Sequence, residues 1–229
     1  MSSNYPDRDI RQRELIPPER LARIHAIVVG VGAVGRQVAL QLAATGVPAM
    51  DLIDHDRVAV ENLAPQGYWP QDLDLPKVDA TGQLCRCIYP QIELTCEAEP
   101  FRRSSAKRLE SLRRKGVQLA LFCCVDSIVT RKLIWQSARQ HIHFFADGRM
   151  SAEVIRVLAS ARPAQDDFYA TTLFAAERAY AGSCTAKSTL YTASIAAGLM
   201  VGQFAKWLRG LPADRDLTIN LLAAELAVA

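Results

Sequence analysis

Short, mostly apolar runs, the first of them β-branched at 27–29, alternate along the chain with longer segments in which apolar residues recur every three to four positions. Short runs of this kind are typical of buried strands, and the longer spacing is typical of helices packed on one face. The pattern therefore predicts an α/β fold, a doubly wound Rossmann-like sheet that is mostly parallel and has helices on both faces. Its predicted strands are 27–29, 49–53, 93–97, 117–125 and 143–146, and its predicted helices are 33–45, 77–88, 104–115 and 128–140.

The two ends of the chain have a different texture. Residues 1–23 are polar and rich in arginine, and Pro17 and Pro18 favour a short lead-in helix, so we interpret 1–23 as an N-terminal arm. After Ala152 the pattern predicts a strand at 154–159, a loop or irregular helix at 162–183, a long buried helix at 188–208 and a last strand at 217–222. We expect these elements to extend the same sheet, which makes 24–229 a single domain.

Composition and charge exclude several classes of protein. Half of the 229 residues are hydrophobic, 22% are charged, and the formal net charge is only +3. Nucleic-acid binding is not implied, because the basic cluster at 102–115 contains Glu110 at helical spacing and reads as a solvated helix face. We also expect no membrane association and a cytoplasmic location, since neither a signal peptide nor a membrane-spanning run is evident.

Cysteine usage indicates reduced thiols. The spacing C-x-x-C does not occur, so we expect no structural zinc, and five of the six cysteines fit small core positions. Cys184 differs because it precedes the predicted long helix, where a helix N-terminus would lower the pKa of a thiol. We consider it both as a nucleophile and as a structural thiol.

A glycine loop joins the first predicted strand to the first helix. Gly30, Gly32 and Gly35 permit a tight turn and leave N–H groups at the helix start for a phosphate, although such a turn can also simply pack a helix on a strand. Asp54 ends the next strand, where a carboxylate can bond ribose hydroxyls. These residues alone are compatible with NAD as well as ATP.

Further polar residues favour ATP with Mg²⁺. Adenylyl transfer requires positive charge around the α-phosphate and the departing pyrophosphate, supplied by cations and by a metal held on carboxylate. Lys77 offers the cation, and Asp126, directly after a buried strand, offers the metal ligand. The loop and helix start after the second strand are crowded with Asp54, Asp56, Asn62, Gln66 and Lys77.

The ordered motifs GVGAVG, DHDRVAVENLAPQ, PKVDA and VDSIVTR resemble the ThiF/MoeB/HesA family, bacterial relatives of ubiquitin-activating enzymes, from about Arg8 to Leu208. The resemblance implies that ATP and Mg²⁺ are used to adenylate the C-terminal glycine of a ubiquitin-like or sulfur-carrier protein or a peptide. It implies that Asp54 holds the ribose, that Asn62 and Lys77 contact phosphates, and that Asp126 binds Mg²⁺ and organises the α-phosphate. Arg131 would brace its loop.

The resemblance also implies a partner subunit. The segment RDIRQRELIP is similar to the family's R-x-x-R-Q entry, in which the second arginine, here Arg11, reaches into the partner's active site. A homodimer is therefore expected. In some relatives a cysteine at the position of Cys184 attacks the acyl adenylate.

Two features depart from the family pattern. The zinc-binding cysteine pairs of many relatives are missing, and Pro65 stands where N-L-x-R-Q places an arginine on the triphosphate. Either another cation such as Arg57 or Arg149 substitutes, or adenylation is slow, altered or absent. Arg149 follows a predicted strand, where it would steady a substrate anion or pair with Asp147 or Glu153.

Two alternative functions stay open. One is a catalytically inactive ThiF-like scaffold subunit that dimerises and docks a ubiquitin-like partner. The other is an NAD-dependent reductase, which would leave Asn62, Lys77 and Asp126 unexplained.

Overall fold

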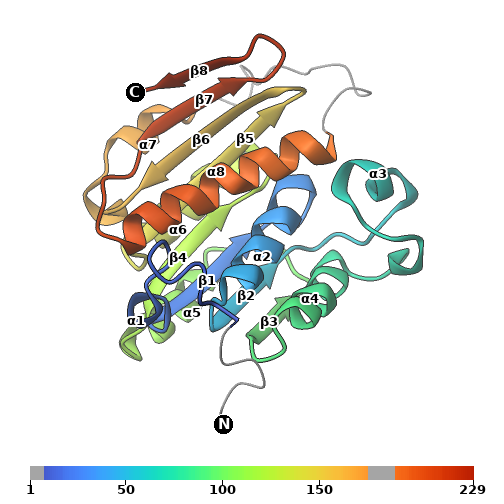
Figure 1. Cartoon of the computed structure of the whole chain (residues 1–229), viewed down its shortest axis with the longest axis horizontal. Helices are drawn as coiled ribbons and strands as arrows, with labels where there is room; N and C mark the ends of the chain where they lie inside the picture. The colour runs from blue at the N-terminus through green and yellow to red at the C-terminus, as the bar shows by residue number, and fades with distance from the viewer. Residues whose placement is uncertain (1–7, 175–188) are drawn as a thin grey trace.

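An eight-stranded sheet runs through the molecule, in the order β3-β2-β1-β4-β5-β6-β7-β8 (Figure 1). The computed structural model describes residues 8–174 and 189–229. The parallel strands are β1 (Ile24–Val29), β2 (Ala49–Ile53), β3 (Glu93–Glu97), β4 (Gln118–Cys123) and β5 (Phe144–Ser151). The antiparallel strands are β6 (Val154–Ser160), β7 (Asp216–Asn220) and β8 (Glu225–Val228). The predicted fold class is confirmed, and the C-terminal strands extend the same sheet.

Helices cover both faces of the sheet. One face carries α2 (Ala33–Thr45), α4 (Lys77–Ile88) and α8 (Leu190–Leu208), which lie side by side in front of the sheet in Figure 1. The other carries α5 (Ser105–Arg114) and α6 (Ile128–Ala138). Each face has its own apolar core, because strands that are buried on both sides must be covered by helices on each face. The short helices are α1 (Pro18–Leu21), α3 (Leu63–Gln66), α7 (Phe168–Thr171) and the 3₁₀ turns Val60–Asn62, Pro70–Asp72 and Pro163–Gln165.

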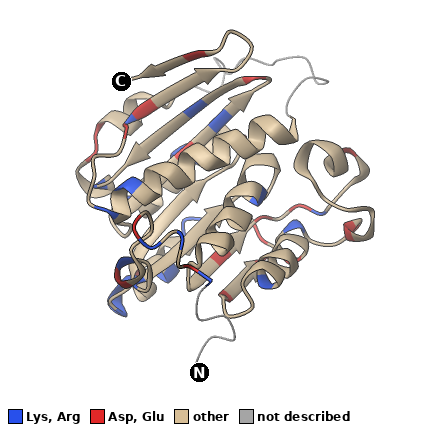
Figure 2. Ribbon diagram, viewed as in Figure 1, with Lys and Arg blue, Asp and Glu red and all other residues tan. Residues whose placement is uncertain are grey.

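Helix α8 is apolar around most of its circumference. Lys206, near its end, is its one charged residue (Figure 2). A helix of this composition is stable only when other elements surround it, and α8 packs against α2, β5 and β6. Within residues 8–174 and 189–229, the structure contains no helix with an apolar stretch long enough to cross a bilayer.

Three sequence-based expectations about this fold are wrong. The strand predicted at 143–146 continues to Ser151, because pairing with β6 extends it, so Asp147 and Arg149 lie inside β5 rather than after it. Strand β8 was not predicted, since its four residues are all exposed and leave no alternation of burial. Cys87 is exposed, two positions along α4 from the buried Cys85, rather than in the core.

The N-terminal arm is tied to the C-terminal end of α2. Arg8 Nη2 donates hydrogen bonds to the carbonyl oxygens of Ala43 (3.0 Å) and Ala44 (2.9 Å), and Gln12 Nε2 donates to that of Thr45 (2.9 Å). The last carbonyl groups of a helix have no hydrogen-bond donors within the helix, so these side chains supply the donors. The arm therefore lies at the opposite end of α2 from the glycine loop.

Candidate functional site

Three parallel strands end at the same level of the sheet. In the register of the sheet, Val29 of β1 stands opposite Ile53 of β2 and opposite Cys123 of β4. Backbone hydrogen bonds continue past these ends, from Gly30 N to Ile53 O and from Cys124 N to Val29 O, both 2.8 Å. The glycine loop, Asp54 and the segment that leads to Asp126 therefore emerge together at the carboxyl edge, where open α/β sheets bind ligands.

The glycine loop is packed too tightly for side chains at two of its positions. A Cβ at Gly30, which has a φ of +84°, would lie 2.9 Å from the carbonyl oxygen of Cys124. A Cβ at Gly35 would lie only 1.8 Å from the carbonyl oxygen of Gly30. Helix α2 begins directly after Gly32, and no side chain in the described part of the chain caps its N-terminus. Its first N–H groups can therefore serve an anion.

Asp54 lies against this loop. Its Oδ2 accepts a hydrogen bond from Val31 N (2.7 Å), and its Oδ1 accepts one from Asp56 N (2.8 Å). The half-buried carboxylate is thereby fixed beside the first turn of the loop. The sequence motif and the structure agree on this neighbourhood of glycine loop and acid.

Lys77 and Asp56 are brought together across the site. Lys77 is the first residue of α4, and its Nζ lies 2.8 Å from Asp56 Oδ2. The lysine side chain is 7% exposed and that of Asp56 is 51% exposed, so the pair joins a buried cation to the solvent side of the loop. Asn62 is buried, and its Oδ1 accepts a hydrogen bond from Ala59 N (3.0 Å), which closes its own turn.

Asp126 is exposed and lies three residues beyond the end of β4. Its carboxylate forms no hydrogen bond or ion pair with any residue that the structure describes. Such an open carboxylate beside a glycine loop offers the hard oxygen donors that Mg²⁺ prefers. The chemistry of the donor therefore fits the expected metal.

A buried ionic cluster supports the loop that carries Asp126. Arg131 on α6 pairs with Asp147 and donates hydrogen bonds from Nη2 to the carbonyl oxygens of Val125 and Gly148. Asp147 is fully buried and also accepts hydrogen bonds from Arg149 Nε (2.8 Å) and Tyr169 Oη (3.0 Å). Arg131 thus braces the residue before Asp126, as expected. Of the two roles considered for Arg149, the structure shows the pairing with Asp147.

One other candidate, Arg11, is not part of this arrangement within one chain. Arg11 lies in the arm, at the far end of α2, and is exposed. Cys184 lies outside the described residues.

The structure adds two residues that sequence reasoning missed. Tyr68 Oη donates a hydrogen bond to Val31 O (2.6 Å) and lies 3.1 Å from Thr81 Oγ1, so this buried ring joins the glycine loop to α4. Arg36 stacks over that ring, with its guanidinium carbon 4.3 Å from the centroid. Burial raises the pKa of Tyr68. The sequence signal that could have pointed to Arg36 is its position directly after Gly35 of the glycine loop.

Comparisons with known proteins show the family of the chain and its fold. The model of the ThiF family matches residues 8–226. A sulfur carrier protein adenylyltransferase of Thermus thermophilus is 36% identical over 42% of this chain and 35% of its own length. A sulfur carrier protein ThiS adenylyltransferase of Escherichia coli is 30% identical over 51% of this chain and 45% of its own length. The matched parts thus span less than half of these relatives.

Solved structures show the same fold at lower identity. The structure of Escherichia coli MccB superposes with a TM-score of 0.78 at 13% identity, over 100% of this chain and 70% of that one. PaaA superposes with a TM-score of 0.74 at 20% identity, over 98% of this chain and 68% of that one. Because the family model matches nearly the whole chain, this protein belongs to the ThiF family.

Proposed function

We propose that this protein is an ATP-dependent adenylyltransferase that activates a carboxylate. The observation that carries the proposal is the convergence at one level of the sheet of the glycine loop, Asp54 and Asp126. A helix N-terminus for phosphate, an acid for ribose and an open carboxylate for a metal are the parts that adenylyl transfer needs. The adenylyltransferase names of the two curated relatives support the same chemistry.

The reaction follows from these parts. An oxygen of the substrate carboxylate attacks the α-phosphorus of ATP, and the bond from that phosphorus to the oxygen of the leaving pyrophosphate breaks. The products are an acyl adenylate and pyrophosphate. The start of α2 holds phosphate oxygens, Asp54 holds the ribose, and Asn62 and Lys77 contact the phosphates. Mg²⁺ bound at Asp126 would neutralise charge that develops on the phosphates.

We infer that the carboxylate is the C-terminal glycine of a ubiquitin-like or sulfur-carrier protein or of a peptide. The names of the curated relatives refer to sulfur carrier proteins, and MccB has been crystallised with MccA. Arg11 would complete the site of a partner subunit in a homodimer, because the arm holds it far from its own glycine loop. Cys184 stays a candidate for accepting the acyl group.

A catalytically inactive scaffold is the second candidate. Pro65, in α3, favours it, because proline cannot supply the charge that the family pattern places there. The two candidates differ in one observable product, the acyl adenylate.

The experiment combines binding with product formation. Calorimetry with ATP and Mg²⁺, and separately with NAD, should show binding of ATP. Incubation with ATP labelled at the α-phosphate and a carrier protein that ends in Gly-Gly should then give a labelled acyl adenylate with the wild type and not with Asp126→Asn. Binding of NAD without binding of ATP would refute the proposal. Binding of ATP without any product would favour the scaffold.

A further inference from the structure

Arg36 is a buried cation to which no carboxylate of the described residues is bound. The residue is 2% exposed, and its Nε and Nη2 donate hydrogen bonds to one carbonyl oxygen, that of Gly67 (3.2 and 2.8 Å). Its Nη1 is buried and has no hydrogen-bond partner among residues 8–174 and 189–229. Burial lowers the pKa of Arg36, and the neighbouring Tyr68 and Asp72 oppose this effect. A buried guanidinium without a counter-charge destabilises the protein, and a bound anion would remove this penalty.

The other cations around the glycine loop already have partners. Lys77 pairs with Asp56, and Arg131 and Arg149 share Asp147. Arg57 is exposed, and its Nη1 donates a hydrogen bond to the carbonyl oxygen of Asp74 (2.5 Å). Neither Arg57 nor Arg149, the two substitutes considered for the missing arginine, is therefore a buried cation that lacks a counter-charge.

Arg36 is joined to the glycine loop by short links. It follows Gly35 directly on α2, and it stacks on Tyr68, whose hydroxyl is bonded to Val31 O. Its carbonyl partner, Gly67, lies two residues after Pro65. A second buried atom of the same turn, Gln66 Oε1, also lacks a hydrogen-bond partner within the described part of the chain and faces Gly32, 3.9 Å from where its Cβ would lie. Two side chains at this turn, Arg36 of α2 and Gln66 of α3, thus each hold a buried polar atom without a partner among the described residues.

We propose that Arg36 binds the terminal phosphates of ATP at the glycine loop and supplies the positive charge that Pro65 cannot. This inference rests on the proposed function, because it assumes that the nucleotide is a triphosphate. It makes Arg36 a determinant of preference for ATP over AMP, beside Asn62 and Lys77, since AMP lacks the terminal phosphates. The charge thus comes from α2 instead of α3.

The test is calorimetry of ATP and of AMP, each with Mg²⁺, on the full chain. Arg36→Met should weaken ATP binding by about 10- to 150-fold, the range for losing a charge-assisted hydrogen bond, and leave AMP binding unchanged. Arg36→Lys keeps the charge and should lose less; it also serves if the methionine variant does not fold. The matched control is Arg57→Met, which should bind ATP as the wild type does.

Three results would overturn the role of Arg36. The first is an ATP affinity of Arg36→Met equal to that of the wild type. If Arg36→Met does not fold, the equivalent result is wild-type ATP affinity in both Arg36→Lys and Arg57→Met. Another is an equal loss for ATP and AMP, which a structural role would produce. The third is a loss in Arg57→Met instead. A wild type that binds no ATP refutes the proposed function and this inference together, whereas each of the three results above leaves the proposed function intact.

Discussion

Replacing Asp147 with asparagine should destabilise the protein strongly. The fully buried carboxylate pairs with Arg131 and Arg149, whose side chains are 7% and 14% exposed. Asparagine has nearly the same volume, so the substitution removes charge without opening a cavity. It leaves two guanidinium groups in the interior without their shared counter-charge, and it leaves Tyr169 with a weaker acceptor.

The expected loss is large on the scale of protein stability. Removing one partner of a buried ion pair costs about 3–5 kcal/mol, out of a total of roughly 5–15 kcal/mol for a typical protein. At about 2–4 °C per kcal/mol for a chain of this size, the melting temperature should fall by about 6–20 °C. Because Arg131 holds Val125 O, adenylate formation should also fall in the fraction that stays folded.

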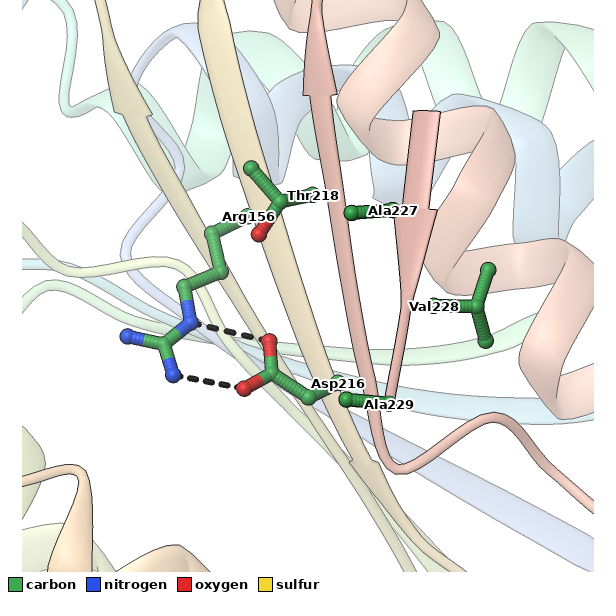
Figure 3. Close-up of a pocket in the computed structure, with 6 residues that line it drawn as sticks. All are labelled: Arg156, Asp216, Thr218, Ala227, Val228 and Ala229. Carbon is green, nitrogen blue, oxygen red and sulfur yellow. Dashed lines mark hydrogen bonds and ion pairs between the residues drawn. The ribbon is translucent and has the colours of Figure 1, made fainter. Parts of the chain in front are cut away.

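An ion pair of the same chemistry on the neighbouring strands provides the control. Arg156 of β6 donates two hydrogen bonds to Asp216 of β7, from Nε to Oδ1 (2.9 Å) and from Nη2 to Oδ2 (2.6 Å) (Figure 3). This arginine is 39% exposed, so Asp216→Asn should cost at most about 1 kcal/mol. Urea and thermal unfolding followed by circular dichroism measure both variants. Equal losses for Asp147→Asn and Asp216→Asn would refute the argument from burial.

Four further predictions follow from single contacts. Gly35→Ala should lower the urea midpoint and abolish ATP binding, because its Cβ meets Gly30 O, whereas Gly202→Ala, in open space on α8, should gain about 0.5–1 kcal/mol. The hydrogen bond from Arg156 lowers the pKa of Asp216 from its ordinary value of 3.8, so the carboxylate stabilises the folded protein fully at neutral pH. This stabilisation is lost as the pH falls below about 4, where the urea midpoints of the wild type and Asp216→Asn should converge. Iodoacetamide at neutral pH should label the exposed Cys87 well before Cys85, whose pKa burial raises to about 12, as peptide mass spectrometry would show. Tyr68→Phe should cost about 1 kcal/mol in thermal unfolding through loss of the hydrogen bond to Val31 O, and a melting temperature unchanged from the wild type would contradict it.

The parallel half of the fold could be predicted because its signals are local. The helical periods of 33–45 and 77–88, and the short, mostly apolar run at 49–53, coincide with α2, α4 and β2. The continuation of β5 and the existence of β8 depend instead on pairing with distant strands, which leaves no periodic trace in an exposed segment.

The sequence predicts which residues lie at this edge of the sheet better than it predicts the contacts between them. Asp54 and Asp126 follow strands, and parallel strands deliver their ends to one edge, so their proximity follows from the topology. Lys77 and Asp56 were both singled out, but their pairing joins residues 21 positions apart and depends on how the intervening loop folds. Arg36 was missed because an arginine on a helix ordinarily faces solvent.

Because the arm is attached to the end of α2, the proposed dimer can be tested by mixing two variants. Thirteen residues of helix separate the arm from the glycine loop by about 20 Å, so one chain cannot unite its own Arg11 with its own Asp126. Two inactive variants, Arg11→Ala and Asp126→Asn, should therefore complement each other when mixed. Each heterodimer holds one site with both residues intact, so an equal mixture should regain about a quarter of the wild-type sites.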